Sequence, residues 1–122
     1  MTLHVISEEF SVCKLKDYSQ IDPSHPFTFT GATDEEYSLV CPTSVVPSNT
    51  TECSDGWRAF RNEGTLDISL IGILSKISAV LAENRIGIFA ISTFNTDYIL
   101  TKAADFEKAL ALLSAEGYTI KH

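Results

Sequence analysis

Apolar and polar residues follow clear periods over residues 65–120. The segment 66–70 alternates apolar with polar residues, which is the pattern of a half-buried strand. Beyond Gly72 the apolar residues recur with the period of a helix, and they predict one apolar helix face. That face comprises Ile73, Leu74, Ile77, Val80 and Leu81. The next segment, 86–93, is rich in β-branched and aromatic residues and predicts a buried strand.

A hairpin and a second helix are predicted after that strand. Asn95 suits a turn, and the segment 98–101 predicts the antiparallel partner strand. Asp105 is the predicted N-cap of the helix and Gly117 its C-terminal stop, before a short strand at 118–120. The apolar face of this helix comprises Phe106, Ala109, Leu110 and Leu113. The resulting order is β-α-β-β-α-β, with helices packed on an antiparallel sheet.

The first half of the chain has less helical pattern. Strands are predicted at 3–6, 10–15, 27–30 and 37–41. The acidic segment 33–36 is long enough for one helical turn at most. The segment 42–56 is rich in Pro, Ser, Thr and Asn, so it predicts the loop or linker between the halves. Residues 57–60 predict a strand that leads into the second half.

Composition and charge exclude several classes of protein. The chain has 122 residues, 44% of them hydrophobic and 20% charged, as in a soluble globular protein with a core. Its net charge of -7 argues against nucleic-acid binding and against docking on anionic membranes. Neither a membrane-spanning segment nor a signal peptide is expected. The 3 widely spaced cysteines favour free thiols in a reducing cytoplasm.

The sequence offers little support for catalysis. His4, His25 and His122 lack metal-ligand spacing, and no nucleophile motif surrounds a cysteine. Neither a phosphate-binding loop nor a dinucleotide fingerprint is present. We therefore expect no enzyme activity, no cofactor and no metal, and a small enzyme with an unrecognised acid or cysteine stays the remote alternative.

Two positions suit a small polar ligand. Gly72 precedes a helix N-terminus, whose unpaired amides and partial positive charge favour a carboxylate. Asp97 follows the predicted turn, where its carboxylate suits a ligand ammonium or guanidinium. Each has a structural alternative: the glycine relieves crowding at a turn, or Asp97 stabilises the hairpin as an Asx-turn.

Several segments together resemble a known family. They are Gly56-Trp57-Arg58, Gly72-Ile73-Leu74, Leu81-Ala82 with Ile86, residues 91–100, the helix end from Ala109 to Gly117, and residues 33–40. These segments resemble the ACT-domain family of regulatory modules. The resemblance is closest to short tandem ACT-like proteins related to the C-terminal regions of aspartokinases and to CASTOR-type amino-acid sensors.

The resemblance implies an α+β fold of two ferredoxin-like ACT-like units, residues 1–56 and residues 57–122, with the first degenerate. It also implies a cytoplasmic regulatory or sensor module that binds an amino acid at the junction of the units, frequently as a homodimer. The implied ligand-binding residues are Ile71, Gly72, Ile73, Leu74, Thr93, Phe94, Asn95, Thr96 and Asp97, with Asp34, Glu35 and Ser38 from the first half. The main alternative is a partner-binding or dimerisation module with a vestigial pocket.

Overall fold

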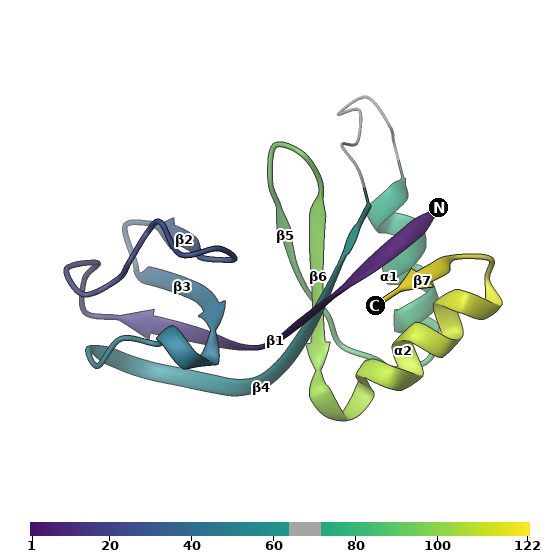
Figure 1. The fold of residues 1–122 in the computed structure, drawn as a ribbon. Helices are drawn as coiled ribbons and strands as arrows, with labels where there is room; N and C mark the ends of the chain where they lie inside the picture. The colour runs from purple at the N-terminus through teal and green to yellow at the C-terminus, as the bar shows by residue number, and fades with distance from the viewer. Residues whose placement is uncertain (64–71) are drawn as a thin grey trace. The chain divides into compact units, whose positions relative to one another are not determined.

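A computed structural model describes residues 1–63 and 72–122, and over these residues the chain is an α+β protein (Figure 1). The described elements include two α-helices and a 7-stranded, mostly antiparallel sheet. The contacts divide the chain into two compact units. We call residues 1–7 with 58–122 the helical unit, and residues 8–57 the hairpin unit. Two long strands, β1 (Thr2–Leu15) and β4 (Thr50–Asn62), run through both units.

In the helical unit, two helices pack against strands of the sheet. The hairpin of β5 (Phe89–Ser92) and β6 (Asp97–Lys102) is antiparallel and lies next to β4. β7 (Thr119–Lys121) pairs in parallel with the start of β1. α1 (Ile73–Glu83) and α2 (Ala103–Ala115) share one apolar core with these strands. The fully buried members of that core include Leu3, Phe60, Ile77, Leu81, Ile99, Ala109 and Leu113.

The ends of α1 agree with the apolar periodicity of the sequence. Its buried face includes Ile77 and Leu81, as predicted. The helix stops at Asn84, and Arg85 then adopts a positive φ of 60°. The amide of Ile86 donates to the carbonyl of Leu81 at 2.9 Å, which satisfies one of the last carbonyls of the helix.

The start of α2 differs from the prediction, whereas its end is confirmed. The N-cap is Lys102, without a side-chain cap, and Asp105 lies inside the first turn. The alanines after Lys102 favour helix, so the helix begins before Asp105, whose carboxylate instead faces the positive end of the helix dipole. Gly117 has a φ of 100°, and the amide of Tyr118 donates to the Leu113 carbonyl at 3.1 Å.

The hairpin unit has strand order β2-β3-β1-β4. β2 (Phe29–Ala32) and β3 (Tyr37–Pro42) form an antiparallel hairpin, and β3 pairs with the second part of β1. Across residues 8–57, all of which are described, the helical element after β3 is the single 3-10 turn η1 (Thr43–Val45). A small core of Cys13, Leu15, Leu39 and Cys41 is covered by the loop side chains Tyr18, Ile21, Val45 and Val46.

Two further predictions for the first half are wrong. The strands predicted at 3–6 and 10–15 are one continuous strand, β1, whose exposed middle residues remain extended. The predicted linker at 42–56 ends at residue 49, because β4 already begins at Thr50. In the hairpin unit β4 is the last strand of the order, so polar residues are tolerated on it. Residues 33–36, for which one helical turn at most was expected, form the β2–β3 turn. The strand predicted at 66–70 lies outside the described residues.

Candidate ligand site

The β5–β6 turn is closed by one threonine. The amide of Thr93 donates to the Thr96 carbonyl at 2.9 Å, and the Thr93 hydroxyl donates to the same oxygen at 2.8 Å. The Thr93 hydroxyl also accepts from the Thr96 amide at 3.3 Å. Thr96 is buried, and its own hydroxyl donates to the Asn62 carbonyl at 3.2 Å. The turn is therefore held to the end of β4.

Asp97 begins β6 directly after this turn. Its Oδ1 accepts a hydrogen bond from the Ser92 hydroxyl at 2.6 Å, across the last pair of the hairpin. The side chain is half-buried. Because Thr93 closes the turn, Asp97 is not needed for an Asx-turn, and its expected contact with a ligand cation stays a prediction.

Phe94 and Asn95 form the tip of the turn. Phe94 is 96% exposed, and Asn95 is also exposed. An aromatic ring with this exposure has no protein wall around it in the single chain. The role expected for Phe94, an apolar wall of a ligand pocket, would require a ligand or a second protein surface to cover the ring.

The start of α1 presents amides that have no side-chain cap among the described residues. Gly72 is the N-cap, with a φ of 84°, and the first intrahelical bond runs from the Lys76 amide to the Gly72 carbonyl. The amides of Ile73 and Leu74 precede that bond, and the cap has no side-chain hydrogen bond. A Cβ added at Gly72 would meet nothing within 4 Å, so its φ and not crowding explains the glycine. Ile71 lies outside the described residues.

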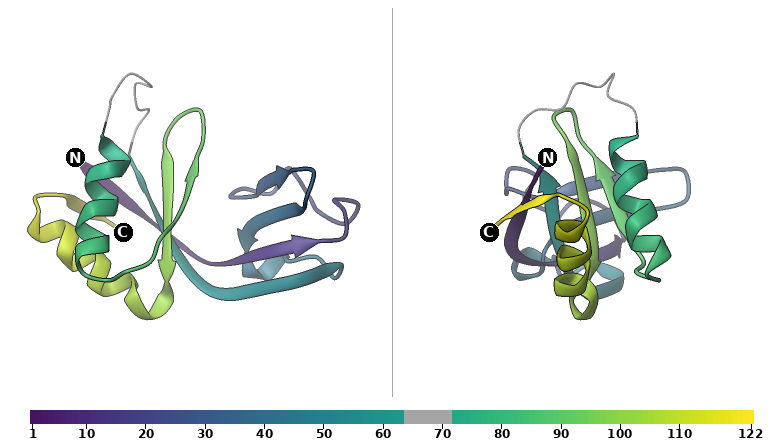
Figure 2. Two further views of the ribbon diagram at one scale, coloured as in Figure 1. Left: turned by 180° about the vertical axis from the view of Figure 1, so that it is seen from behind. Right: turned by 90° about the vertical axis from the view of Figure 1, so that its right-hand side faces the viewer.

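The start of α1, the end of β4 and the β5–β6 turn lie at the same end of the helical unit in both views of Figure 2. The two segments that the sequence singled out, at residues 72–74 and 93–97, therefore lie at one end of this unit (Figure 2). The structure adds the last residue of β4 to them.

That last residue, Asn62, was missed by the sequence analysis. Its side chain is 0% exposed, yet neither its amide nitrogen nor its amide oxygen has a hydrogen-bond partner among the described residues. Buried polar groups in native proteins are generally paired, with protein, water or a ligand. The available signal was a polar residue two positions after Phe60, which would lie on the same face as Phe60 if the strand predicted at 57–60 continued to residue 62.

The expected residues of the first half lie in the hairpin unit. Asp34 and Glu35 are exposed in the β2–β3 turn, where the amide of Glu35 donates to the Thr33 hydroxyl at 3.1 Å. The carbonyl of Ser38, in β3, accepts a hydrogen bond from the Tyr18 hydroxyl at 2.7 Å. A joint site of these residues with those of the helical unit stays a prediction.

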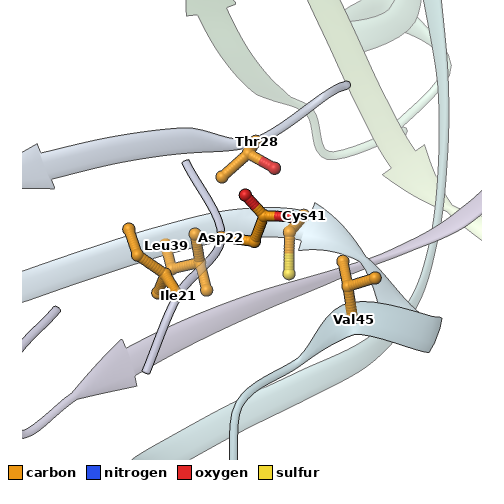
Figure 3. Close-up of a pocket in the computed structure, with 6 residues that line it drawn as sticks. All are labelled: Ile21, Asp22, Thr28, Leu39, Cys41 and Val45. Carbon is orange, nitrogen blue, oxygen red and sulfur yellow. The ribbon is translucent and has the colours of Figure 1, made fainter. Parts of the chain in front are cut away.

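A small pocket of the hairpin unit contains none of the expected site residues. It is lined by Ile21, Asp22, Thr28, Leu39, Cys41 and Val45 (Figure 3). Its volume of about 10 Å³ has room for roughly one water molecule. The Thr28 hydroxyl is buried without a partner among the described residues. Hydrogen bonds from the side chain and then the backbone of Ser24 lower the pKa of Asp22. The pocket is too small for an amino acid.

The described residues offer neither a metal site nor a membrane-spanning helix. Within residues 1–63 and 72–122, no group of three or more His, Cys, Asp or Glu side chains is placed to hold a metal ion. No helix in these ranges is long and apolar enough to cross a membrane.

The fold has clear counterparts among solved structures. Protein Atu0741 of Agobacterium tumefaciens matches with a TM-score of 0.83 and 28% identity, over 98% of this chain and 90% of that one. The aspartate kinase of Clostridium acetobutylicum matches at TM-score 0.65 and 15% identity, over 88% of this chain and 32% of that one. The regulatory subunit of aspartate kinase from Thermus thermophilus, in its ligand-free form, matches at TM-score 0.64 and 8% identity, over 94% and 96%. At such identities the two kinase matches establish a shared fold.

The sequence also matches a family model. Residues 52–115 match the model of the ACT domain. Among curated proteins, none matches the sequence. The predicted resemblance to ACT domains and to aspartokinase regulatory regions is confirmed. The match to the ACT domain covers more than half of the residues of this chain, so the chain belongs to the ACT domain family.

Proposed function

We propose that this protein is a regulatory module that binds an amino acid reversibly and does not transform it. Two findings support the proposal: the ACT family match, and a fold shared with the regulatory subunit of an aspartate kinase. The observation that carries it is the side-chain amide of Asn62, which is buried at the end of β4 without a hydrogen-bond partner among the described residues.

The chemistry of this end of the unit fits a zwitterion. The amides of Ile73 and Leu74, in the first turn of α1, would donate hydrogen bonds to a carboxylate, assisted by the helix dipole. The Asn62 amide offers one acceptor for an ammonium group and two donor hydrogens. A buried amide without partners costs about 1–3 kcal/mol, and a bound polar ligand would recover part of that free energy.

An amino-acid screen tests the proposal. Thermal melting would be recorded with each amino acid in turn, including lysine, threonine, arginine and the branched aliphatic residues. A ligand at about 100 times its dissociation constant adds roughly 2.7 kcal/mol of stability. For a chain of this size that corresponds to a melting shift on the order of 10 °C. Mass spectrometry of the ligand before and after incubation would show whether it is transformed.

The alternative is a partner-binding or dimerisation module, and one observation favours it. Phe94 exposes 96% of its surface at the tip of the β5–β6 turn, as an aromatic contact for another protein surface would. On this reading no amino acid shifts the melting temperature. Light scattering would instead show a homodimer that Phe94→Ser weakens.

We also propose that residues 1–56 and residues 57–122 are two related ACT-like units, of which the first is degenerate. The matching registers of the β2–β3 and β5–β6 hairpins support this. A site shared by both units would then use Asp34, Glu35 and Ser38, and Asp34→Asn would weaken binding of a cationic ligand.

A further inference from the structure

Two of the cysteines lie within bonding reach of each other. The Sγ atoms of Cys13, in β1, and Cys53, in β4, are 3.0 Å apart. The protein holds both as free thiols. Both residues belong to the hairpin unit, where Cys13 is buried and Cys53 is exposed. This pair is independent of the candidate ligand site.

The strands that hold the pair allow a disulfide. β1 and β4 are neighbours in the sheet, and they are antiparallel. Their direction follows from two backbone hydrogen bonds, Lys16 to Asn49 and Glu63 to Thr2. The Sγ–Sγ distance of 3.0 Å shows that both side chains lie on the same face of the sheet. A disulfide has an S–S length of about 2.05 Å, so closing the bond requires the two sulfur atoms to approach by about 1 Å.

We propose that Cys13 and Cys53 are a redox-active pair that forms a reversible disulfide by exchange with a small-molecule disulfide such as oxidised glutathione. The oxidised protein then has a covalent link between β1 and β4 in the hairpin unit. Cys41 remains a thiol. Strained or exposed cross-strand disulfides are the readily reduced kind, which suits a reversible modification in a reducing compartment.

The order of the two steps follows from exposure. Cys53 is the accessible thiol, so its thiolate attacks one sulfur of the small disulfide, the S–S bond breaks, and one small thiolate leaves. Cys13 then attacks Cys53 Sγ, the mixed disulfide breaks, and the second small thiolate leaves. The two protons of the cysteine thiols end on the two released thiols. Two protein thiols are oxidised, and one small-molecule disulfide is reduced.

Burial explains why Cys13 acts second. Burial, and then the hydrogen bond and charge of Cys53, raise the pKa of the Cys13 thiol far above its ordinary value. Once Cys53 is in a mixed disulfide its contribution as a neighbouring anion disappears, and the 3.0 Å separation makes the second attack intramolecular. Cys41 serves as the control thiol, because burial raises its pKa, to about 11, as burial also raises the pKa of Cys13.

The test uses the intact protein and oxidised glutathione. After incubation, the protein is denatured without reductant, its remaining thiols are alkylated, and its mass is measured. We expect wild type to lose two of its 3 alkylatable thiols and the mass of two hydrogen atoms, without a glutathione adduct. Peptide mapping should join Cys13 to Cys53, and dithiothreitol should restore all three thiols.

Matched serine variants identify the roles. Cys13→Ser should accumulate a glutathione adduct on Cys53, because the second step has no nucleophile. Cys53→Ser should show neither disulfide nor adduct, and Cys41→Ser should behave as wild type. Circular dichroism of each variant controls for folding, and Cys13→Ala replaces any serine variant that unfolds. Retention of all three thiols by wild type, a disulfide that includes Cys41, or a disulfide between two chains would overturn the proposal.

Discussion

The β2–β3 and β5–β6 hairpins have the same strand pairing and the same kind of turn, but different side chains at the tip of the turn. Phe29 pairs with Val40 and Ala32 with Tyr37 in one hairpin, and Phe89 pairs with Leu100 and Ser92 with Asp97 in the other. Both turns begin with a threonine whose amide donates to the carbonyl three residues later at 2.9 Å, and both threonine hydroxyls bond to turn amides. Between these fixed points one turn has Asp34 and Glu35, and the other has Phe94 and Asn95. The threonine sets the turn, and the tip residues are free to serve recognition.

The units diverge directly after their hairpins. Pro42, before η1, has φ -54° and ψ 138°, and Lys102, before α2, has the similar values -58° and 142°. In the hairpin unit Val45 and Val46 then disfavour helix, and Pro47 has no amide to donate to the Thr43 carbonyl. After Lys102 the alanines favour helix instead. A few residues thus decide whether a unit gains a helix.

The largest expected effect compares how much α2 and η1, the elements that follow the two hairpins, contribute to the free energy of unfolding. Phe106→Ala removes a fully buried ring of α2 that packs near Phe60, and it should reduce the free energy of unfolding by about 3–5 kcal/mol. Val45→Ala, in half-buried η1, should cost about 1 kcal/mol. Urea denaturation followed by circular dichroism measures both. Equal losses would mean that η1 contributes as much as α2.

The second prediction separates stability from binding. Asn62→Leu replaces a buried, unpartnered amide by an apolar group of similar size, so the ligand-free protein should become more stable by about 1 kcal/mol. Affinity for the amino acid found in the screen should fall by roughly one to two orders of magnitude. Calorimetry and thermal melting measure the two effects, with Glu107→Ala, at an exposed position of α2, as the control. A destabilised Asn62→Leu protein with normal affinity would make Asn62 a structural residue.

The third prediction addresses the shared threonines. Thr93→Val and Thr33→Val each keep the shape of the side chain and remove its hydroxyl, and each should cost about 1 kcal/mol of stability. The control is Thr30→Val, at an exposed position of β2, which should change the free energy of unfolding by less than about 0.5 kcal/mol. If one threonine variant costs nothing in chemical denaturation, the two turns are not stabilised in the same way.

The smallest effects are expected at the tips. Phe94→Ser and Glu35→Ser should each change the free energy of unfolding by less than about 0.5 kcal/mol, because both side chains are exposed. If the protein is a homodimer held at the β5–β6 tip, Phe94→Ser should weaken the dimer and Glu35→Ser should not. Light scattering over a dilution series gives both dissociation constants, and equal values would remove the tip from the interface.

The parts of the fold with one clear period were predictable from the sequence. α1, the β5–β6 hairpin and the Gly117 stop follow from apolar spacing and local backbone preference. The start of β4 at Thr50 could not be predicted in this way, because a strand at the edge of its unit needs no alternation of apolar and polar residues. Of the candidate site, Gly72 and residues 93–97 were named from the sequence, and their contact with a ligand stays a prediction. The sequence could not reveal the isolation of the Asn62 amide or the Cys13–Cys53 contact, because both depend on packing between residues far apart in the chain.

The division of the chain has a consequence for how such proteins can be cut and recombined. The helical unit takes residues 1–7 from one end of the chain and residues 58–122 from the other, with the whole hairpin unit inserted between them. Leu3 and Val5 are buried in its core, and β7 pairs with the start of β1. A fragment that begins at residue 57 would lose both contributions, and we expect it to express poorly. The hairpin unit is therefore one continuous segment that could be exchanged as an insert. The helical unit, by contrast, needs both of its segments, residues 1–7 and 58–122.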